Sequence, residues 1–257
     1  MRLSPAAVLR GPGEVLAMAA DVVRFSFTTK FQLREYVEQA AFITQVTLMP
    51  TILVSIPFGA VIALQVASLT GQLGAQSFAG ATAVLATVRE AAPIAAALII
   101  AGAAGSAICA DLGARKIREE IDAMEVLGIN PVARLVVPRA LATVTVAILM
   151  NGIVIAAGIV GGYFFTVIVQ GGSAGAFLAG FTALATLPDI YVSMVKAAVF
   201  GFIAAVIGAY KGLGAGGGPS GVGQAVNESV IVAFMLLFLL NAIISALYFQ
   251  VVPQSGL

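Results

Sequence analysis

Residues 110–139 read ADLGARKIREEIDAMEVLGINPVARLVVPR, and their charge sets them apart from the rest of the chain. The 257 residues include 13 Lys and Arg and 12 Asp and Glu, and ten of these 25 lie in this stretch. Long apolar runs flank it on both sides, so we expect a charged, helical surface between two membrane spans on which a soluble partner docks. The ten are Asp111, Arg115, Lys116, Arg118, Glu119, Glu120, Asp122, Glu125, Arg134 and Arg139.

Composition places the chain in a membrane. It is 60% hydrophobic and 10% charged, with a mean hydropathy of +1.06, whereas a soluble domain carries about 25% charged residues. The net charge of +1 gives no sign of nucleic-acid binding. Histidine is absent and Cys109 is the single cysteine, which excludes Ser-His-Asp and Cys-His catalysis, His-based metal sites and an internal disulfide. We therefore expect an all-α integral membrane protein that is not an enzyme, with no catalytic residue and no metal.

Five apolar segments are long enough to cross the membrane as helices, since about 20 residues span roughly 30 Å of hydrocarbon. Pro50, Pro57 and Pro93 fall inside the first two and are expected to bend them or break their hydrogen bonding. The segments are 41–69, 79–110, 140–169, 190–210 and 230–251.

Lys and Arg outside these segments are confined to alternate connections. Five precede the first span, five lie in residues 110–139, and Lys211 lies between the fourth and fifth spans. Residues 70–78, 170–187 and 252–257 have none. The positive-inside rule then predicts a cytoplasmic N-terminus, a C-terminus outside, and a cytoplasmic location for the charged stretch.

The segment before the first span predicts an amphipathic helix over residues 14–38. Val23, Phe27 and Phe31 recur every four residues, while charged side chains line another face. We expect this helix to lie in the inner membrane interface because the first span follows at once, although a soluble helix packed on a partner is the alternative. Residues 1–40 are thus assigned to the cytoplasmic N-terminus with this helix, and 41–257 to a five-span membrane domain.

Within the charged stretch, residues 115–127 lack Gly and Pro and are rich in helix-forming residues. Gly128 fits a C-terminal cap, and Pro131 lies just beyond it. A solvated loop helix is the alternative to a docking surface, and composition alone favours neither. The expected i, i+4 ion pairs are Arg115–Glu119 and Arg118–Asp122.

Three charged side chains lie inside predicted spans, where each costs about 2.5–3.5 kcal/mol unless paired or hydrated. Arg89 and Glu90 in the second span and Lys196 in the fourth lie at similar depths in the outer half, so Glu90 is expected within reach of Lys196. They are expected to line an outward-opening lipid cavity or to form a buried ion pair that fixes helix register, and the two roles are compatible. Asp189 is expected at the outer interface without a special role.

Glycine spacing predicts close packing between helices. The small-xxx-small pairs Gly158/Gly162 and Gly208/Gly212 are expected where helices approach closely, either within the chain or at a subunit interface. Residues 212–217 match G-x-G-x-x-G, but no strand–helix–strand pattern surrounds them. They predict a loop rather than a dinucleotide site.

Three motifs resemble those of the MlaE/YrbE permeases, most closely the actinobacterial YrbE branch, over about residues 35–249. Many members carry an Arg between glycines where this chain has Ala103 and Ala104, so any role of that Arg is not transferred. The first motif is E-E-I-D-A-(M/L) at 119–124 with Gly128, Pro131 and a closing P-R at 138–139. The others are R-E-x-x-P at Arg89, Glu90 and Pro93, and K-x-x-x-F at Lys196 and Phe200.

The resemblance implies the permease subunit of an ABC transporter that moves fatty acids, sterols or phospholipids across the inner (plasma) membrane, with import as the expected direction. ATP and Mg would bind a separate ATPase, and this chain would bind no cofactor. The implied partners are ABC ATPase subunits, a second YrbE-type permease chain in a heterodimer, and MCE-domain proteins on the outer side. An ion-coupled secondary transporter of a hydrophobic substrate is the alternative function.

The resemblance also implies roles for particular residues. The charged stretch, residues 111–139, would contain a coupling helix that sits in a groove of the ATPase. The implied coupling residues are Arg115, Arg118, Glu119, Glu120, Asp122, Ala123, Met124, Gly128 and Pro131. The implied lipid-path residues are Arg89, Glu90, Pro93 and Lys196.

Overall fold

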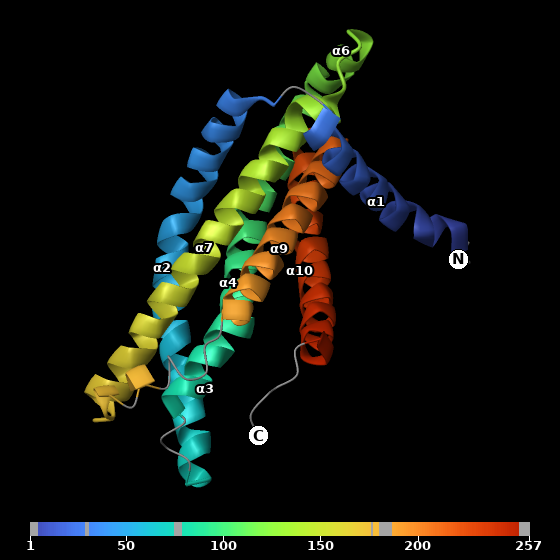
Figure 1. Ribbon diagram of the computed structural model, residues 1–257. Coiled ribbons are helices and arrows are strands. Elements are labelled where there is room, and N and C mark those ends of the chain that lie inside the picture. The colour runs from blue at the N-terminus through green and yellow to red at the C-terminus, as the bar shows by residue number, and fades with distance from the viewer. Residues whose placement is uncertain (1–4, 29–30, 75–78, 176, 180–186, 252–257) are drawn as a thin grey trace. The chain divides into compact units, whose positions relative to one another are not determined.

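Among the residues that the structure describes, five helices of the computed structural model are long and apolar enough to cross a membrane (Figure 1). The prediction of an all-α, multi-pass membrane protein is confirmed, and most of these helices extend beyond the apolar segments read from the sequence. The five are Leu33–Gln72, Ala79–Ile117, Val132–Val169, Leu187–Leu213 and Gly218–Tyr248. The structure describes residues 5–28, 31–74, 79–175, 177–179 and 187–251.

The second and third long helices contain π-helical turns, in which the backbone is locally widened. Turns η2 and η3 lie within the second long helix, and η4 and η5 open and close the third. The elements in chain order are α1 (Pro5–Thr28), α2 (Leu33–Gln72), α3 (Ala79–Ala86), η2 (Thr87–Ala91), α4 (Ala92–Ile100), η3 (Ala101–Gly105), α5 (Ser106–Ile117), α6 (Glu120–Val126), η4 (Val132–Val136), α7 (Val137–Tyr163), η5 (Phe164–Val169), α9 (Leu187–Leu213) and α10 (Gly218–Val251).

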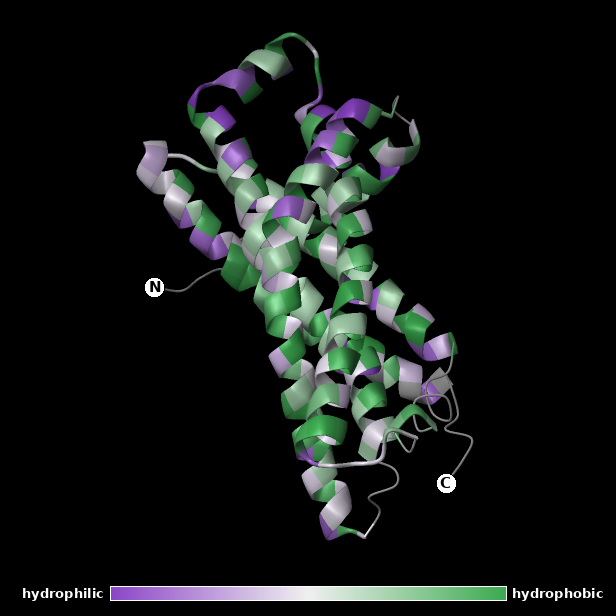
Figure 2. Cartoon of the chain, turned by 90° about the vertical axis from the view of Figure 1, so that its left-hand side faces the viewer, coloured by the Kyte–Doolittle hydropathy of each residue, from purple (hydrophilic) through white to green (hydrophobic). Residues whose placement is uncertain are grey.

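The chain forms two compact units, and the long helices contribute to both. Hydrophobic residues colour most of the length of the long helices in Figure 2, and hydrophilic residues concentrate at helix ends. Unit 1 consists of Met1–Thr44, Ile100–Val146 and Gly201–Leu236. Unit 2 consists of Gln45–Ile99, Ala147–Phe200 and Leu237–Leu257. The charged stretch therefore belongs to unit 1, and Arg89, Glu90 and Lys196 belong to unit 2.

Helix α1 is amphipathic and packs one face on unit 1. Val22 is buried in a hydrophobic core with Ile108 and Leu135. On another face Val23 and Phe27 are 49% and 87% exposed. Exposed apolar side chains on a helix that is otherwise packed are typical of an interaction with lipid or a partner.

The predicted single helix over residues 14–38 is wrong, because the structure has two helices there. Helix α1 ends at Thr28, and α2 begins at Leu33 and continues directly into the first span. Near the end of α1 the Ser26 hydroxyl donates to the carbonyl oxygen of Val22 at 2.7 Å. Hydroxyl bonds of this kind compete with the helical backbone and are common near helix ends. The apolar period did not reveal the break, because Phe31 keeps the four-residue spacing although it lies before the start of α2.

Glycines bring α2 and α7 into backbone contact within unit 2. A Cβ atom added to Gly59 would lie 2.1 Å from the carbonyl oxygen of Gly158. A Cβ on Gly161 would lie 2.3 Å from the carbonyl oxygen of Ile56. Neither position has room for a side chain, so the two helices meet with no side chain between them.

A similar contact joins α9 to the second long helix within unit 1. A Cβ on Gly208 would lie 2.5 Å from the carbonyl oxygen of Gly105, and one on Gly212 would lie 2.7 Å from that of Cys109. The predicted small-xxx-small pairs therefore include positions of close packing within the chain.

Gly161→Ala is expected to destabilise the protein, because the methyl group would overlap the backbone of α2; overpacking of this kind costs about 1–3 kcal/mol. Gly152→Ala, also on α7, is the matched control, because a Cβ there meets nothing within 4 Å. Thermal aggregation in detergent, followed by size-exclusion chromatography, should show a lower midpoint for Gly161→Ala only. Equal midpoints for the two variants would contradict the tight contact.

Candidate functional site

The R-E-x-x-P motif lies on a π-helical turn that ends just before a proline. Arg89 and Glu90 belong to η2, and Pro93 follows in α4. Proline has no N–H, so the carbonyl oxygen of Arg89, four residues earlier, loses its usual α-helical donor. The ammonium group of Lys196 donates to that oxygen at 3.0 Å. The proline thus leaves an acceptor that the lysine satisfies.

Lys196 also forms the ion pair expected from the sequence. Its side chain is 1% exposed, and its Nζ lies 3.0 Å from Oε1 of Glu90 and 2.8 Å from the Ser245 hydroxyl. Glu90 accepts further hydrogen bonds from Asn241 at 3.0 Å and from Ser245 at 2.8 Å. The two polar side chains of α10 thus share the carboxylate with the lysine.

Asp189 is part of a second pair, so the expectation that it has no special role is wrong. Its side chain is fully buried, and Oδ1 lies 2.6 Å from Nε of Arg89 and 2.6 Å from the hydroxyl of Tyr248. The Arg89 guanidinium also lies 5.5 Å from the centre of the Tyr248 ring, within range of a cation–π interaction. One sequence signal could have found Asp189: the predicted spans hold two cations and one anion, so a further carboxylate was needed.

Together these residues form an ion-pair cluster in unit 2: Arg89, Glu90, Asp189 and Lys196, with Asn241, Ser245 and Tyr248 from α10. The four charges cancel. Glu90 is the most accessible of them at 39% exposure, whereas Arg89 is 19% and Lys196 1% exposed. Any molecule that reaches the cluster would therefore meet the Glu90 carboxylate before the lysine. The described residues contain no group of three or more His, Cys, Asp or Glu side chains placed to hold a metal.

The charged stretch of unit 1 is not one continuous helix. Helix α5 ends at Ile117 and α6 begins at Glu120, because Glu119 adopts a left-handed conformation with φ of 61°. The turn brings Ile121 into the hydrophobic core of unit 1, where it is 3% exposed. Burial of Ile121 thus overrides the helical propensity that favoured an unbroken helix.

The break changes the ion pairs, so the predicted i, i+4 pairs are wrong. Arg115 instead pairs with Asp111 at 3.2 Å, and Arg118 pairs with Glu120 at 2.8 Å. Asp122 pairs with Lys116. These acidic groups have partners within the segment, which reduces the net charge they present to another protein.

The end of α6 agrees with the sequence. Gly128 has φ of 73°, and the amide of Ile129 donates to the carbonyl oxygen of Met124 at 2.9 Å. This 6→1 bond is the Schellman arrangement. Asn130 then accepts from the amide of Val132 at 2.9 Å, which caps the start of the next helix.

The exposed surface of α6 differs in part from the expected contact residues. Val126 and Leu127 are 88% and 75% exposed at the tip. The sequence analysis missed them, although an apolar dipeptide directly before a glycine cap is visible in the sequence. Among the implied coupling residues, Arg115 and Met124 are half-buried and Pro131 is buried. The exposed ones are Arg118, Glu119, Glu120, Asp122, Ala123 and Gly128.

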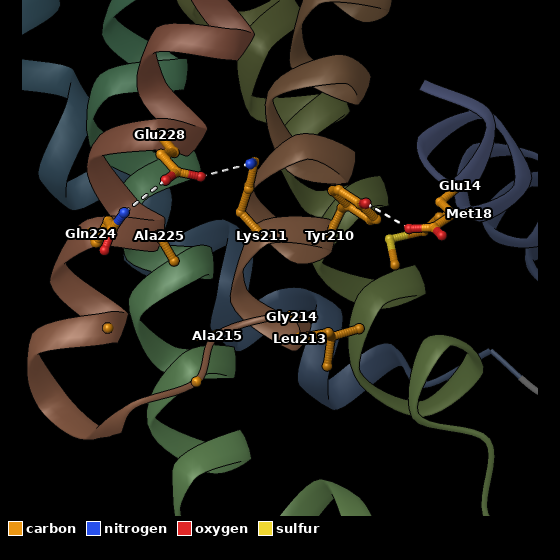
Figure 3. A pocket seen from close by; sticks show the side chains of 12 residues that line it. Glu14, Met18, Tyr210, Lys211, Leu213, Gly214, Ala215, Gln224, Ala225 and Glu228 are labelled. Atoms are coloured by element: carbon orange, nitrogen blue, oxygen red, sulfur yellow. Dashed lines mark hydrogen bonds and ion pairs between the residues drawn. The ribbon is translucent and has the colours of Figure 1, made fainter. Parts of the chain in front are cut away.

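A pocket of about 490 Å³ lies in unit 1 where α9 ends and α10 begins. Figure 3 shows Glu228 between Gln224 and Lys211, whereas Tyr210 points toward Glu14 of α1. The Glu228 carboxylate lies 2.8 Å from Nζ of Lys211, and the Tyr210 hydroxyl donates to Glu14 at 2.8 Å. Both carboxylates thus have donors within the pocket.

A second pocket of about 470 Å³, lined by residues of the charged stretch, shares one wall residue with the first. Leu213 at the end of α9 lines both. The surface beside α6 is therefore hollowed rather than flat, which suits the side chains of a protein partner.

Asp189→Asn is expected to destabilise the protein by about 3–5 kcal/mol, because it leaves the mostly buried Arg89 without a counter-charge. Tyr248→Phe removes only a hydrogen bond to the same carboxylate and should cost about 0.5–1.5 kcal/mol. Unfolding in detergent, followed by circular dichroism, gives the comparison. Equal losses would show that Arg89 and Asp189 are not a buried ion pair.

Comparison with known proteins gives consistent matches. Residues 36–247 match the family described as Permease MlaE. A probable ABC transporter permease protein of Rickettsia typhi is 34% identical over 156 residues, 60% of each chain. One from Porphyra purpurea is 30% identical over 186 residues, 72% of this chain and 71% of the relative. The intermembrane phospholipid transport system permease protein MlaE of Haemophilus influenzae is 30% identical over 155 residues, 60% of this chain and 59% of the relative.

The match thus spans about 60% of the length of several of these relatives. The family match itself is longer and includes the ion-pair cluster of unit 2 except for Tyr248, and the whole charged stretch of unit 1. It begins and ends close to the limits expected from the motifs. This chain belongs to the MlaE permease family.

Proposed function

We propose that this chain is the permease subunit of an ABC transporter that moves lipids across the inner (plasma) membrane, with ATP hydrolysis on separate ATPase subunits. The observation that carries the proposal is α6, a short helix between two long ones whose direction is set by Glu119 and whose tip exposes Val126 and Leu127. A helix with this shape offers a partner an apolar tip surrounded by paired charges. The family match supports an ATPase as that partner.

The orientation proposed from loop charges agrees with this role. With the N-terminus in the cytoplasm and the C-terminus outside, α6 would lie on the side where ATP is available. ATP and Mg would be held by the ATPase, and this chain would hold no cofactor. Transport would require the contact with α6 to differ in free energy between two states of the ATPase, since otherwise hydrolysis would move nothing.

The cargo and the other partners are proposals of the same kind. The Haemophilus relative is named as a phospholipid transport permease, which supports a lipid cargo: phospholipid, fatty acid or sterol. MCE-domain proteins would receive or deliver the lipid on the outer side, with import as the proposed direction. A second YrbE-type chain would complete a heterodimeric core.

The ion-pair cluster is the proposed point of contact with lipid. Its charges balance, and only Glu90 and Arg89 are accessible to a meaningful degree. A carboxylate backed by a buried ammonium can accept a hydrogen bond from a head group without leaving an unpaired charge behind. Lys196 would keep Glu90 in place, and the carbonyl oxygen of Arg89, which loses its α-helical donor to Pro93, would help to hold Lys196.

Glu90→Gln is expected to reduce the lipid that co-purifies with the chain by several-fold, because the amide is a weaker acceptor than the carboxylate. Lys196→Ala should have a similar or larger effect by releasing Glu90. Lipid mass spectrometry of folded, monodisperse protein is the measurement. Ser193→Ala is the control, since Ser193 is buried and bonds Asn151 at 2.9 Å. Unchanged lipid content in both cluster variants would leave the cluster with a purely structural role.

Val126→Asp and Leu127→Asp together are expected to reduce co-purified ATPase more than tenfold. Burial of each side chain is worth about 1.5–3 kcal/mol, and about 1.4 kcal/mol corresponds to a factor of ten. The yield of the permease should not change, because both side chains are exposed. Leu73→Asp, at a side chain that is 81% exposed in unit 2, is the control.

The measurement is mass spectrometry of the proteins that co-purify with the tagged chain, expressed at its native level. An ATPase, a second permease chain and MCE proteins should be recovered with the parent. Recovery of the chain alone, under conditions that preserve other ABC complexes, would contradict the proposal. Uptake that survives ATP depletion and follows a proton gradient would support the ion-coupled transporter instead.

A further inference from the structure

Arg139 is a buried arginine that joins three helices of unit 1. Its side chain is 2% exposed, although it lies near the start of α7. Its guanidinium donates to the carbonyl oxygen of Leu135 at 2.7 Å and lies 2.9 Å from Oδ2 of Asp111 on α5. It also lies 3.2 Å from Oε1 of Glu35 in the first turn of α2. From the sequence, Arg139 was expected as one charge of the stretch 110–139 and as the end of the closing P-R motif, not as a buried side chain.

The pairing continues from Arg139 toward α6. The other oxygen of Asp111 lies 3.2 Å from Nε of Arg115. Arg115 in turn reaches Glu120, the first residue of α6, at 3.8 Å. Charges of alternating sign thus run from α6 to α2, and we refer to these five residues as the charge chain: Glu120, Arg115, Asp111, Arg139 and Glu35.

The charge chain is anchored at Arg139, its buried member. Removal of a carboxylate from a buried arginine is costly, so Asp111 and Glu35 are held to it although they are 40% and 32% exposed. Glu120 and Arg115 are 44% and 34% exposed, and their contact at 3.8 Å is the longest of the chain. A cavity of about 380 Å³ is lined by the four members of the chain other than Glu120.

We infer that the charge chain makes the first turn of α2 follow α6. The inference rests on the proposed function, because it assumes that a bound ATPase moves α6. Arg139 is then a positioning residue that acts through Asp111 and Glu35. Helix α2 contains Pro50 and Pro57, so the inference concerns only its turns before Pro50.

Glu35→Gln is the variant that tests this. It removes the charge at the α2 end and leaves Asp111 to neutralise Arg139, so the fold should persist. Glu38→Gln is the matched control one turn further along α2, because Glu38 pairs only with Arg34 among the ion pairs of the described residues, and both are exposed. Arg139→Ala is less informative, since loss of the buried arginine threatens the fold itself.

The readout is the distance between spin labels on Glu125→Cys in α6 and Val37→Cys in α2, measured by pulsed electron paramagnetic resonance on the purified complex with its ATPase. Cys109 is fully buried, so the native thiol is protected from the label. Spectra are recorded without nucleotide and after trapping with ATP and vanadate. If Glu35 had a purely structural role, Glu35→Gln would change the distance by the same amount in the nucleotide-free and the trapped state.

In the parent and in Glu38→Gln the distance should agree between the two states within about 1 Å, because α6 and α2 move together. In Glu35→Gln the two states should differ by about 2 Å or more, the scale of helix shifts in switching proteins. In the double variant Glu35→Gln with Glu120→Gln, the difference in distance between the two states should be no greater than in the more affected of the two single variants.

A state-independent distance in Glu35→Gln, or an equal change in Glu38→Gln, would overturn the role of the charge chain while leaving the proposed function intact. Absence of a bound ATPase from the parent complex would overturn the proposed function itself.

Discussion

A charge or an unbonded carbonyl inside an apolar helix bundle has to be satisfied by the protein, because hydrocarbon offers no hydrogen bonds. That constraint organises unit 2. Pro93 removes the α-helical donor of the Arg89 carbonyl oxygen, Lys196 donates to that oxygen, and Glu90 balances the lysine. Arg89 then requires Asp189. Each of these groups thus supplies the hydrogen bond or the counter-charge that another one needs.

The same cluster explains how α10 is held. The most apolar part of α10 is only 17% buried, the lowest share among the five long helices. Helices with so little buried apolar area gain little from packing, but α10 supplies Asn241, Ser245 and Tyr248 to the ion-pair cluster. Directional hydrogen bonds to the cluster therefore add to the apolar contacts that hold α10.

Sequence reasoning was most successful where local rules decide the outcome. The number and approximate limits of the long helices follow from hydrophobic length, and the cap at Gly128 follows from helix-end chemistry. The contact between Glu90 and Lys196 was also predictable, because depth in a span is proportional to residue count. Each of these inferences uses only residues that are close in sequence, or a one-dimensional coordinate across the membrane.

The failures share a different cause. Asp189 and Arg139 resemble interfacial residues in the sequence, and they are buried because partners 100 and 28 residues away face them. The break at Glu119 depends on Ile121 reaching a core built from several helices. Propensity and periodicity carry no information on such distant contacts. The roles of the coupling and lipid-path residues remain proposals.

The left-handed residue at the start of α6 has a consequence for any partner that binds there. A glycine at position 119 would adopt this conformation freely but would also adopt many others, so α6 would point in many directions. Glutamate has fewer alternatives, and its neighbours already hold the turn through the buried Ile121. Less orientational entropy is then lost when the tip is bound. A rigid presentation of this kind favours affinity from a small contact area, because most of the ordering is complete before the partner arrives.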